Sequence, residues 1–244
     1  RMPAVLAYPP RLGYWPAVIG LFAFAWLELV YVDRGQPSTL ALLTLVYAAV
    51  QLVGMSLYGT KEWADRGDAF SVYFGLFARI SPLHWSGGRL ALRAPLAGLP
   101  PMDTPRATVA LLAVMIGSTT FDGFTLGNAW TNMAPWLQDR FASLGLGAEA
   151  ALQAGFTVGL LVAIAAVWTL FRIGIAGVHG VDRTRPSALL ADLFVHSLVP
   201  IALAYVVAHY FGLLSYQGQA MVYLLSDPLG DGSDFFGGAA SAID

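Results

Sequence analysis

Cysteine is absent from this chain of 244 residues, and charged residues are scarce at 11% of positions. The lack of cysteine excludes disulfide frameworks, thiolate metal sites, iron–sulfur clusters and cysteine nucleophiles. The low charge departs from soluble domains, in which about 25% of residues are charged. A net charge of -2 offers no basic stripe to a nucleic acid, so nucleic-acid binding is excluded as a main role. No Gly-x-Ser-x-Gly motif is present, which disfavours a serine hydrolase.

Hydrophobic residues, in contrast, make up 57% of the chain and gather in long runs. A membrane-crossing helix needs about 20 apolar residues to cover ~30 Å of hydrocarbon. Windows of this length predict an all-α, polytopic transmembrane helical bundle of about five spans, forming a single integral membrane domain over residues 1–244. The windows are residues 14–32, 38–58, 107–124, 151–172 and 187–211. Because Pro200 lies inside the last window, we expect the fifth span to bend.

Lys and Arg are distributed unevenly between the two sides of the predicted bundle. Of the 13 Lys and Arg residues, only Arg34 and Arg140 fall on the side opposite the N-terminus. Loops rich in Lys and Arg stay in the cytoplasm, so the N-terminus is predicted to be inside and the C-terminus outside.

The cytoplasmic insert at residues 60–106 contains no spanning window. Residues 66–82 form a short aromatic and apolar run between charged residues, which is typical of an interfacial helix on the membrane surface. Ser86-Gly87-Gly88 is a turn signal followed by residues of alternating polarity, so we expect a small hairpin over residues 85–93. On the outer side, residues 128–142 are expected to form a loop.

Small residues recur at helical spacing in the fourth span, at Gly155, Gly159, Ala163 and Ala166. Small side chains let two helices approach closely. This face is therefore expected to pack against a neighbouring helix rather than to carry chemistry.

Ionisable side chains at membrane depth are costly, which makes each a candidate functional residue. Asp192 and His196, in the inner half of the fifth span, are one helical turn apart on one face, ~6 Å along the axis. The carboxylate could orient the imidazole, or the pair could share a metal ion with a third ligand. Gln51 of the second span could approach them. In the alternative, Asp192 starts the helix near the head groups and His196 is hydrogen-bonded to a carbonyl.

A second polar cluster is predicted at the outer side, where Glu28, Asp122 and His209 lie near the ends of three spans. Two carboxylates and a histidine could hold a metal ion that activates water or binds dioxygen, with Asp122 and Glu28 as the candidate catalytic residues. The alternative is structural: the hydroxyls of residues 118–120 bond back to helix carbonyls, and Asp122 caps the following loop.

The spacing of His196 and His209 bears on the cofactor. Thirteen steps of ~100° leave them ~140° apart around a helix, whereas stacked haems need ligands on one face, so haem is not expected. The order Asp192, His196, His209 is similar to the copper-ligand pattern in the C subunit of particulate methane monooxygenase and its ammonia-oxidising relatives. This resemblance, carried by three positions, implies a copper or zinc ion held by these residues.

A broader resemblance covers nearly the whole chain from about Arg11 onward. The blocks that carry it are residues 12–17, 21–30, 45–59, 67–82, 112–123, 196–219 and 226–236. They resemble a family of multispanning actinobacterial membrane proteins labelled fenitrothion hydrolase. The resemblance implies a multi-pass protein of the bacterial plasma membrane and cleavage of an organophosphate ester. If the reaction is hydrolytic, a bound metal would lower the pKa of water and polarise the phosphoryl oxygen. Family chains are longer at both ends, so ligands absent from this chain could complete a site.

Two functions of different classes follow. The first is an enzyme or enzyme subunit with a buried Asp/His site, a metal-dependent hydrolase or oxidase. The second is a transporter or a structural subunit of a larger membrane complex. In either case the expected partners are the lipid bilayer and other membrane subunits or a second copy of the chain. A continuous wet path linking the level of Asp192 to that of Asp122 would favour transport.

Overall fold

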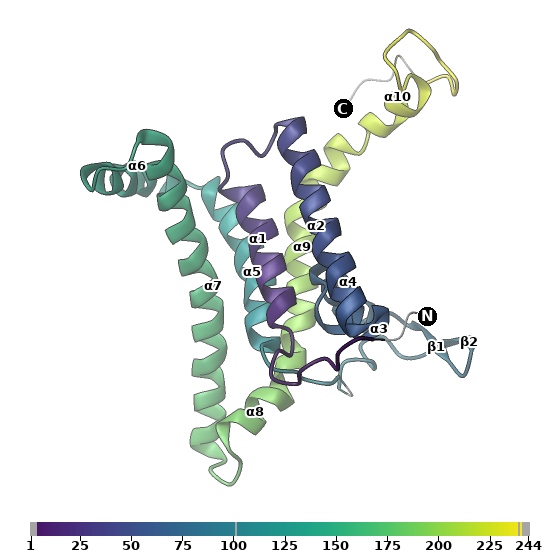
Figure 1. The fold of residues 1–244 in the computed structure, drawn as a ribbon, viewed down its shortest axis with the longest axis vertical. Helices are drawn as coiled ribbons and strands as arrows, with labels where there is room; N and C mark the ends of the chain where they lie inside the picture. The colour runs from purple at the N-terminus through teal and green to yellow at the C-terminus, as the bar shows by residue number, and fades with distance from the viewer. Residues whose placement is uncertain (1–3, 101, 239, 241–244) are drawn as a thin grey trace. The chain divides into compact units, whose positions relative to one another are not determined.

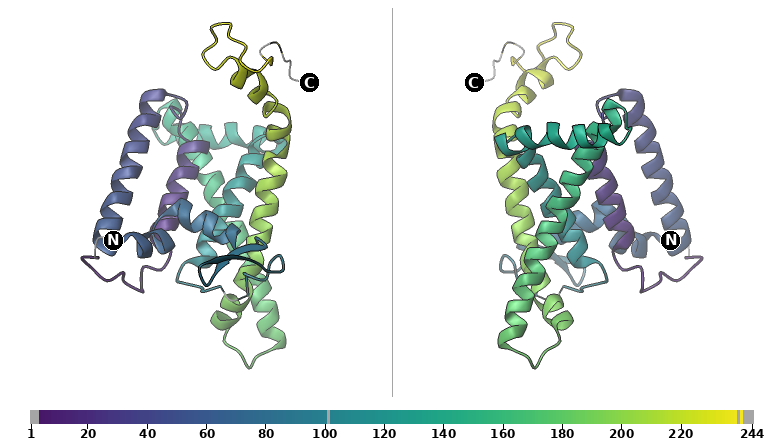
Figure 2. Two further views of the ribbon diagram at one scale, coloured as in Figure 1. Left: turned by 90° about the vertical axis from the view of Figure 1, so that its right-hand side faces the viewer. Right: turned by 90° about the vertical axis from the view of Figure 1, so that its left-hand side faces the viewer.

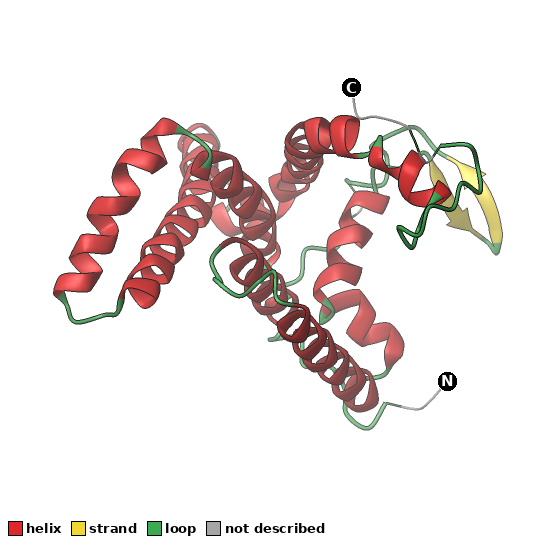
Figure 3. Ribbon diagram, turned by 90° about the horizontal axis from the view of Figure 1, so that it is seen from above, coloured by secondary structure: helices red, strands yellow, loops and turns green. Residues whose placement is uncertain are grey.

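The computed structural model describes residues 4–100, 102–238 and 240, and its architecture is all-α, as predicted. Among these residues, strands occur only in a two-stranded hairpin, drawn in yellow in Figure 3. The strands are β1 Leu83–Ser86 and β2 Arg89–Leu92. The helices, labelled in Figure 1, are α1 Trp15–Leu29, α2 Pro37–Tyr58, α3 Thr60–Arg66, α4 Ala69–Ala78, α5 Thr108–Thr125, α6 Asn128–Ser143, α7 Ala148–Val181, α8 Ser187–Phe194, α9 Leu198–Gln217 and α10 Ala220–Ser226.

The chain forms two compact units, Arg1–Ala202 and Leu203–Asp244, and each is described by itself. The first unit contains α1 to α8 and the first residues of α9. The second unit contains the rest of α9, the short helix α10 and the tail.

Four helical segments are long and apolar enough to cross a membrane, which supports an integral membrane protein. They are α2, α5, α7 and the segment Ser187–Gln217, which includes α8 and α9. The first predicted span is the shorter helix α1, whose 15 residues extend only ~22 Å at 1.5 Å per residue. The number of spans and the orientation therefore stay predictions.

Helix α5 lies at the centre of the first unit, packed between α1 and α7. Its residues 111–117 are all buried, because neighbouring helices surround this apolar run. Gly117 lies where α5 meets α7: a Cβ added there would be only 2.7 Å from the Cα of Ile164. The small-residue face of α7 also packs as expected, because a Cβ on Gly159 would be 2.5 Å from the ring of Phe121.

Helix α2 is exposed where α5 is buried, since Gly54 is its only buried residue. Pro37 in its first turn suits a helix start, and Gly59, at φ +84°, ends it in a conformation that favours glycine. Figure 2 shows α2 at the edge of the first unit, beside α1 and apart from α7. An apolar helix exposed around its circumference is expected of a helix that faces lipid.

The predicted insert contains a helix, α4, within residues 66–82 and the expected hairpin, whereas the preceding helix α3 was not predicted. Asp68 caps α4, because its carboxylate accepts hydrogen bonds from the amides of Phe70 and Ser71 at 3.1 and 3.4 Å. The same carboxylate accepts a 2.5 Å hydrogen bond from the hydroxyl of Tyr47, which ties α4 to α2. Helix α4 also buries one face, including Val72, in the core shared with α1 and α5.

The described connections between helices divide between two ends of the first unit (Figure 1). Residues 4–14, 59–107 and 181–187 lie at one end, which we call the basic end. The α1–α2 connection and α6, which carry Arg34 and Arg140, lie at the other. The sequence separation of positive charge is thus also a separation in space, as a fixed membrane orientation requires.

Pro200 interrupts the fifth predicted span, as expected. Helix α8 ends at Phe194, a 3-10 turn occupies Val195–Ser197, and α9 begins at Leu198. Proline lacks an amide donor and its ring clashes with the carbonyl four residues earlier, so Pro200 is accommodated in the first turn of a new helix.

Two predictions about the helices are wrong. Residues 128–142 form helix α6 and not a loop, although Pro135 lies inside it. Trp130 of α6 is buried against Phe121 and Phe156, and this packing outweighs the polar composition that suggested a loop. Helix α7 continues to Val181, nine residues past its predicted end, and its last turns pack on α8 through Ile175.

Candidate functional site

The predicted inner pair straddles the end of a helix. Asp192 is exposed on α8, and His196 is half-buried in the 3-10 turn that follows. The described residues offer neither side chain a hydrogen bond or an ion pair. Gln51 has a different partner, since its Oε1 accepts a 2.6 Å hydrogen bond from Nε1 of Trp63. The exposure of Asp192 gives a buried Asp/His site no support.

The predicted outer residues are distributed over both units. Glu28 is exposed at the end of α1, and Asp122 is half-buried on α5. His209 belongs to the second unit, where its ring meets the Tyr210 ring edge-on at 4.8 Å. Across the described residues, no three His, Asp or Glu side chains gather closely enough to hold a metal ion. The copper or zinc ion expected at Asp192, His196 and His209 therefore stays a prediction.

The hydroxyls beside Asp122 follow the structural alternative. Thr119 donates to the carbonyl of Met115 at 3.2 Å, and Thr120 donates to that of Ile116 at 2.7 Å. Thr125 donates to the carbonyl of Asp122 at 2.7 Å. These bonds satisfy the hydroxyls within their own helix, which removes the cost of placing them at membrane depth.

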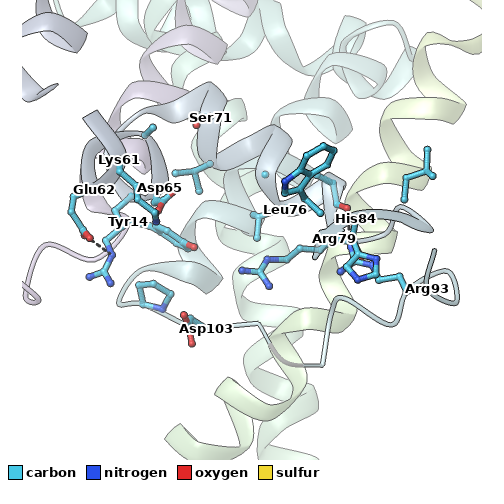
Figure 4. A pocket seen from close by; sticks show the side chains of 18 residues that line it. Tyr14, Lys61, Glu62, Asp65, Ser71, Leu76, Arg79, His84, Arg93 and Asp103 are labelled. Atoms are coloured by element: carbon cyan, nitrogen blue, oxygen red, sulfur yellow. Dashed lines mark hydrogen bonds and ion pairs between the residues drawn. The ribbon is translucent and has the colours of Figure 1, made fainter. Parts of the chain in front are cut away.

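A polar cleft of about 690 Å³ lies at the basic end, between α3, α4 and the hairpin (Figure 4). None of the predicted site residues lines it. Its charged and polar lining residues are Tyr14, Lys61, Glu62, Asp65, Arg66, Ser71, Arg79, His84, Arg93 and Asp103. The signal for this cleft in the sequence was the excess of arginine in the insert, which indicates membrane orientation but not which arginines share a wall.

On the α3 side, the charges of the cleft are balanced within one helix. Lys61 forms an ion pair with Asp65, and Nε of Arg66 lies 3.7 Å from Oε2 of Glu62. Both pairs are four residues apart on α3, and their side chains are largely exposed. Such pairs contribute little stability, but they leave this side nearly neutral.

On the opposite side, Arg93 has a structural role. Its Nε donates to the carbonyl of Ser81 at 3.0 Å, and its Nη2 donates to those of Ala78 and Arg79 at 3.1 and 3.0 Å. These carbonyls lie at and just beyond the C-terminal end of α4, where carbonyl groups lack partners within the helix. A guanidinium at the negative end of the helix dipole is also favourable. Arg93 therefore fixes the hairpin to the end of α4 and has few donors left for a ligand.

Three other polar groups in the cleft have unused hydrogen-bonding capacity. Nη1 of Arg79 makes one long hydrogen bond of 3.4 Å, to the carbonyl of Gly98. Nδ1 of His84 is buried and has no hydrogen-bond partner. The described residues also provide no acceptor for the hydroxyl of Tyr14, a residue only 7% exposed. Figure 4 shows the guanidinium of Arg79 between Tyr14 and His84.

Tyr8 holds the segment that leads into α1 at this end of the unit. Its hydroxyl donates a 2.8 Å hydrogen bond to the carbonyl of Gly13, and its ring meets that of Tyr58 edge-on at 5.2 Å. Burial is the largest influence on this phenol and raises its pKa to about 12, while nearby Arg66 acts in the opposite direction. The phenol thus stays neutral and acts as a donor over the physiological range.

The chemistry of the uncommitted donors suits an anion. A guanidinium presents a planar set of N–H groups that matches the oxygens of a phosphate or carboxylate. A phenol and an imidazole can donate to further oxygens. Among the described residues, Asp103 is the one acidic lining residue that forms no ion pair, and it lies across the cleft from His84 in Figure 4.

Comparison of the chain with protein-family models, with curated proteins and with solved structures finds no match.

Proposed function

We propose that this chain is an integral membrane protein of the bacterial plasma membrane that binds a phosphate-bearing anion at its basic end, on the cytoplasmic side. The observation that carries the proposal is the convergence of Arg79, Tyr14 and His84 on one cleft. Each has hydrogen-bonding capacity that the protein leaves unused. Of these groups, the buried Nδ1 of His84 lacks any partner, which is costly, and an anion in the cleft offers acceptors to Arg79 and Tyr14.

The proposed orientation is supported by the position of the charges. The basic end holds the described residues of the segments richest in Lys and Arg. Segments of this kind are retained in the cytoplasm. A cytoplasmic cleft would have access to free phosphate esters and to phospholipid head groups, which offer the same chemistry to Arg79.

Binding of inorganic phosphate to the purified protein in nanodiscs of phosphatidylcholine, measured by calorimetry, tests the proposal. Arg79→Gln is expected to weaken binding at least about tenfold, which corresponds to ~1.4 kcal/mol. Arg89→Gln is the matched control, because it removes the same charge at the same end from an exposed residue that does not line the cleft. Absence of binding to the unmutated protein, or equal losses in both variants, would contradict the proposal.

The metal-dependent hydrolase or oxidase implied by the resemblance is a separate proposal. It places a copper or zinc ion at Asp192, His196 and His209, with Asp122 and Glu28 as catalytic residues. Because the described residues gather no three ligands, such a site would take further ligands from a neighbouring subunit. Bound metal would supply a water of lowered pKa for ester hydrolysis.

Of the two alternative roles, transporter and structural subunit of a larger membrane complex, the exposure of α2 favours the subunit. Only Gly54 of its 22 residues is buried. A helix with so little protein around it offers a long apolar surface to other membrane helices as well as to lipid. Other membrane subunits or a second copy of the chain are the partners proposed for this surface.

A further inference from the structure

The hairpin has two chemically different faces. In its antiparallel register, Leu83 lies opposite Leu92 and Trp85 lies opposite Leu90. Because side chains alternate between the faces of a strand, these four residues share one face. The other face carries the pairs His84 with Ala91 and Ser86 with Arg89. The hairpin is therefore amphipathic.

The apolar face is largely exposed, although Leu83 and Trp85 also border the polar cleft. The exposed fractions of Leu83, Trp85, Leu90 and Leu92 are 52%, 73%, 62% and 78%. Isolated exposed apolar residues are common, but four adjacent ones, including a tryptophan, form a patch of the kind that marks an interaction surface.

The chain holds this patch close to the membrane. Along the chain, the hairpin comes after α2 and before α5, two helices long enough to span the bilayer. At its base, the amide of Arg93 donates to the carbonyl of Pro82 at 2.8 Å, and the Arg93 side chain binds the end of α4. Figures 1 and 3 both show the hairpin at the periphery of the first unit. The hairpin is therefore attached to the first unit at its basic end.

We propose that the β1–β2 hairpin inserts its apolar face into the boundary between head groups and acyl chains of the leaflet at the basic end. Tryptophan is enriched at this depth, where its ring is in apolar surroundings and its N–H can reach polar groups. Arg89, exposed on the opposite face, provides positive charge for anionic head groups.

Site-directed spin labelling tests this directly, because the natural chain has no cysteine. Leu90→Cys places a nitroxide on the apolar face, and Ser86→Cys places one on the polar face of the same hairpin. In vesicles of phosphatidylcholine and phosphatidylglycerol, the label at residue 90 is expected to collide mainly with oxygen, which concentrates in the bilayer. The label at residue 86 is expected to collide mainly with a water-soluble nickel complex.

Either of two results would overturn the proposal. Strong collision of both labels with the nickel complex would place the apolar face in water. Shielding of residue 90 from both reagents would show that protein, and not lipid, covers the patch. The same measurements on Arg79→Gln separate this proposal from anion binding, since loss of phosphate binding should leave both accessibilities unchanged.

Discussion

The indole Nε1 of Trp63 donates a 2.6 Å hydrogen bond to Oε1 of Gln51 and so joins the surface helix α3 to the apolar helix α2. The Trp63 ring fits only because glycine lies on both sides of it. A Cβ on Gly54 would be 2.1 Å from Cε2 of Trp63, and one on Gly67 would be 2.5 Å from Cε3. Tyr58 stacks on the same ring at 5.9 Å. This cluster positions α3, which forms one wall of the polar cleft.

Replacement of Gln51 by leucine is expected to destabilise the protein by ~1–3 kcal/mol, because the indole N–H of Trp63 would lose its acceptor in a largely buried position. Thermal unfolding in detergent, followed by circular dichroism, would measure the loss. Ser56→Ala on the same helix is the control, since the Ser56 hydroxyl is exposed and bonds only within α2. In Trp63→Phe, the added Gln51→Leu change should cost much less; an unchanged cost would show that the hydrogen bond is not responsible.

A methyl group at residue 54 is expected to force Trp63 out of position. Gly54→Ala should lower stability by ~1–3 kcal/mol through overpacking, although alanine favours helix more than glycine does. Gly174→Ala provides a matched comparison within another long apolar helix, because no atom lies within 4 Å of the added Cβ. That variant should be at least as stable as the unmutated protein. Equal melting temperatures for the two variants would refute the close approach of α2 and α3.

The raised pKa of Tyr8 predicts a loss of stability at alkaline pH. The phenol has an ordinary pKa of 10.0 when exposed in the unfolded chain and a pKa of about 12 in the fold. Its contribution is therefore complete below pH 10 and declines as pH rises from there through 12, where the folded protein must also ionise it. Melting temperatures measured across this range should fall less steeply for Tyr8→Phe. The exposed Tyr216→Phe serves as control and should follow the unmutated protein.

The proposed copper or zinc ion predicts a metal content that depends on histidine. Protein purified without chelators should contain stoichiometric metal by elemental analysis, and His196→Ala and His209→Ala should each lower it. His179→Ala controls for nonspecific binding, because this histidine lies at the end of α7 with its Nδ1 2.9 Å from the carbonyl of Arg185. Background metal in the unmutated protein would remove the metalloenzyme proposal.

Local sequence was sufficient for features set by short-range physics. Long apolar runs predicted the long helices, because backbone groups in a bilayer must be satisfied within the segment. The Ser86-Gly87-Gly88 turn predicted the hairpin, and Pro200 predicted the interruption at Val195–Ser197. Helix α6 could not be predicted in this way, since it depends on the burial of Trp130 against distant residues.

For the candidate site too, local spacing predicted some features, whereas others depended on the tertiary structure. Spacing could place Asp192 and His196 on one turn, but it could not show that α8 ends between them or that Asp192 is exposed. It also could not pair Gln51 with Trp63, nor bring Arg79, Tyr14 and His84 to one cleft.

The sequence by itself determined the helical, membrane-embedded character and the separation of charge, because these follow from composition and period. Only the tertiary structure decided which polar groups meet, because their partners come from helices and loops far apart in the chain.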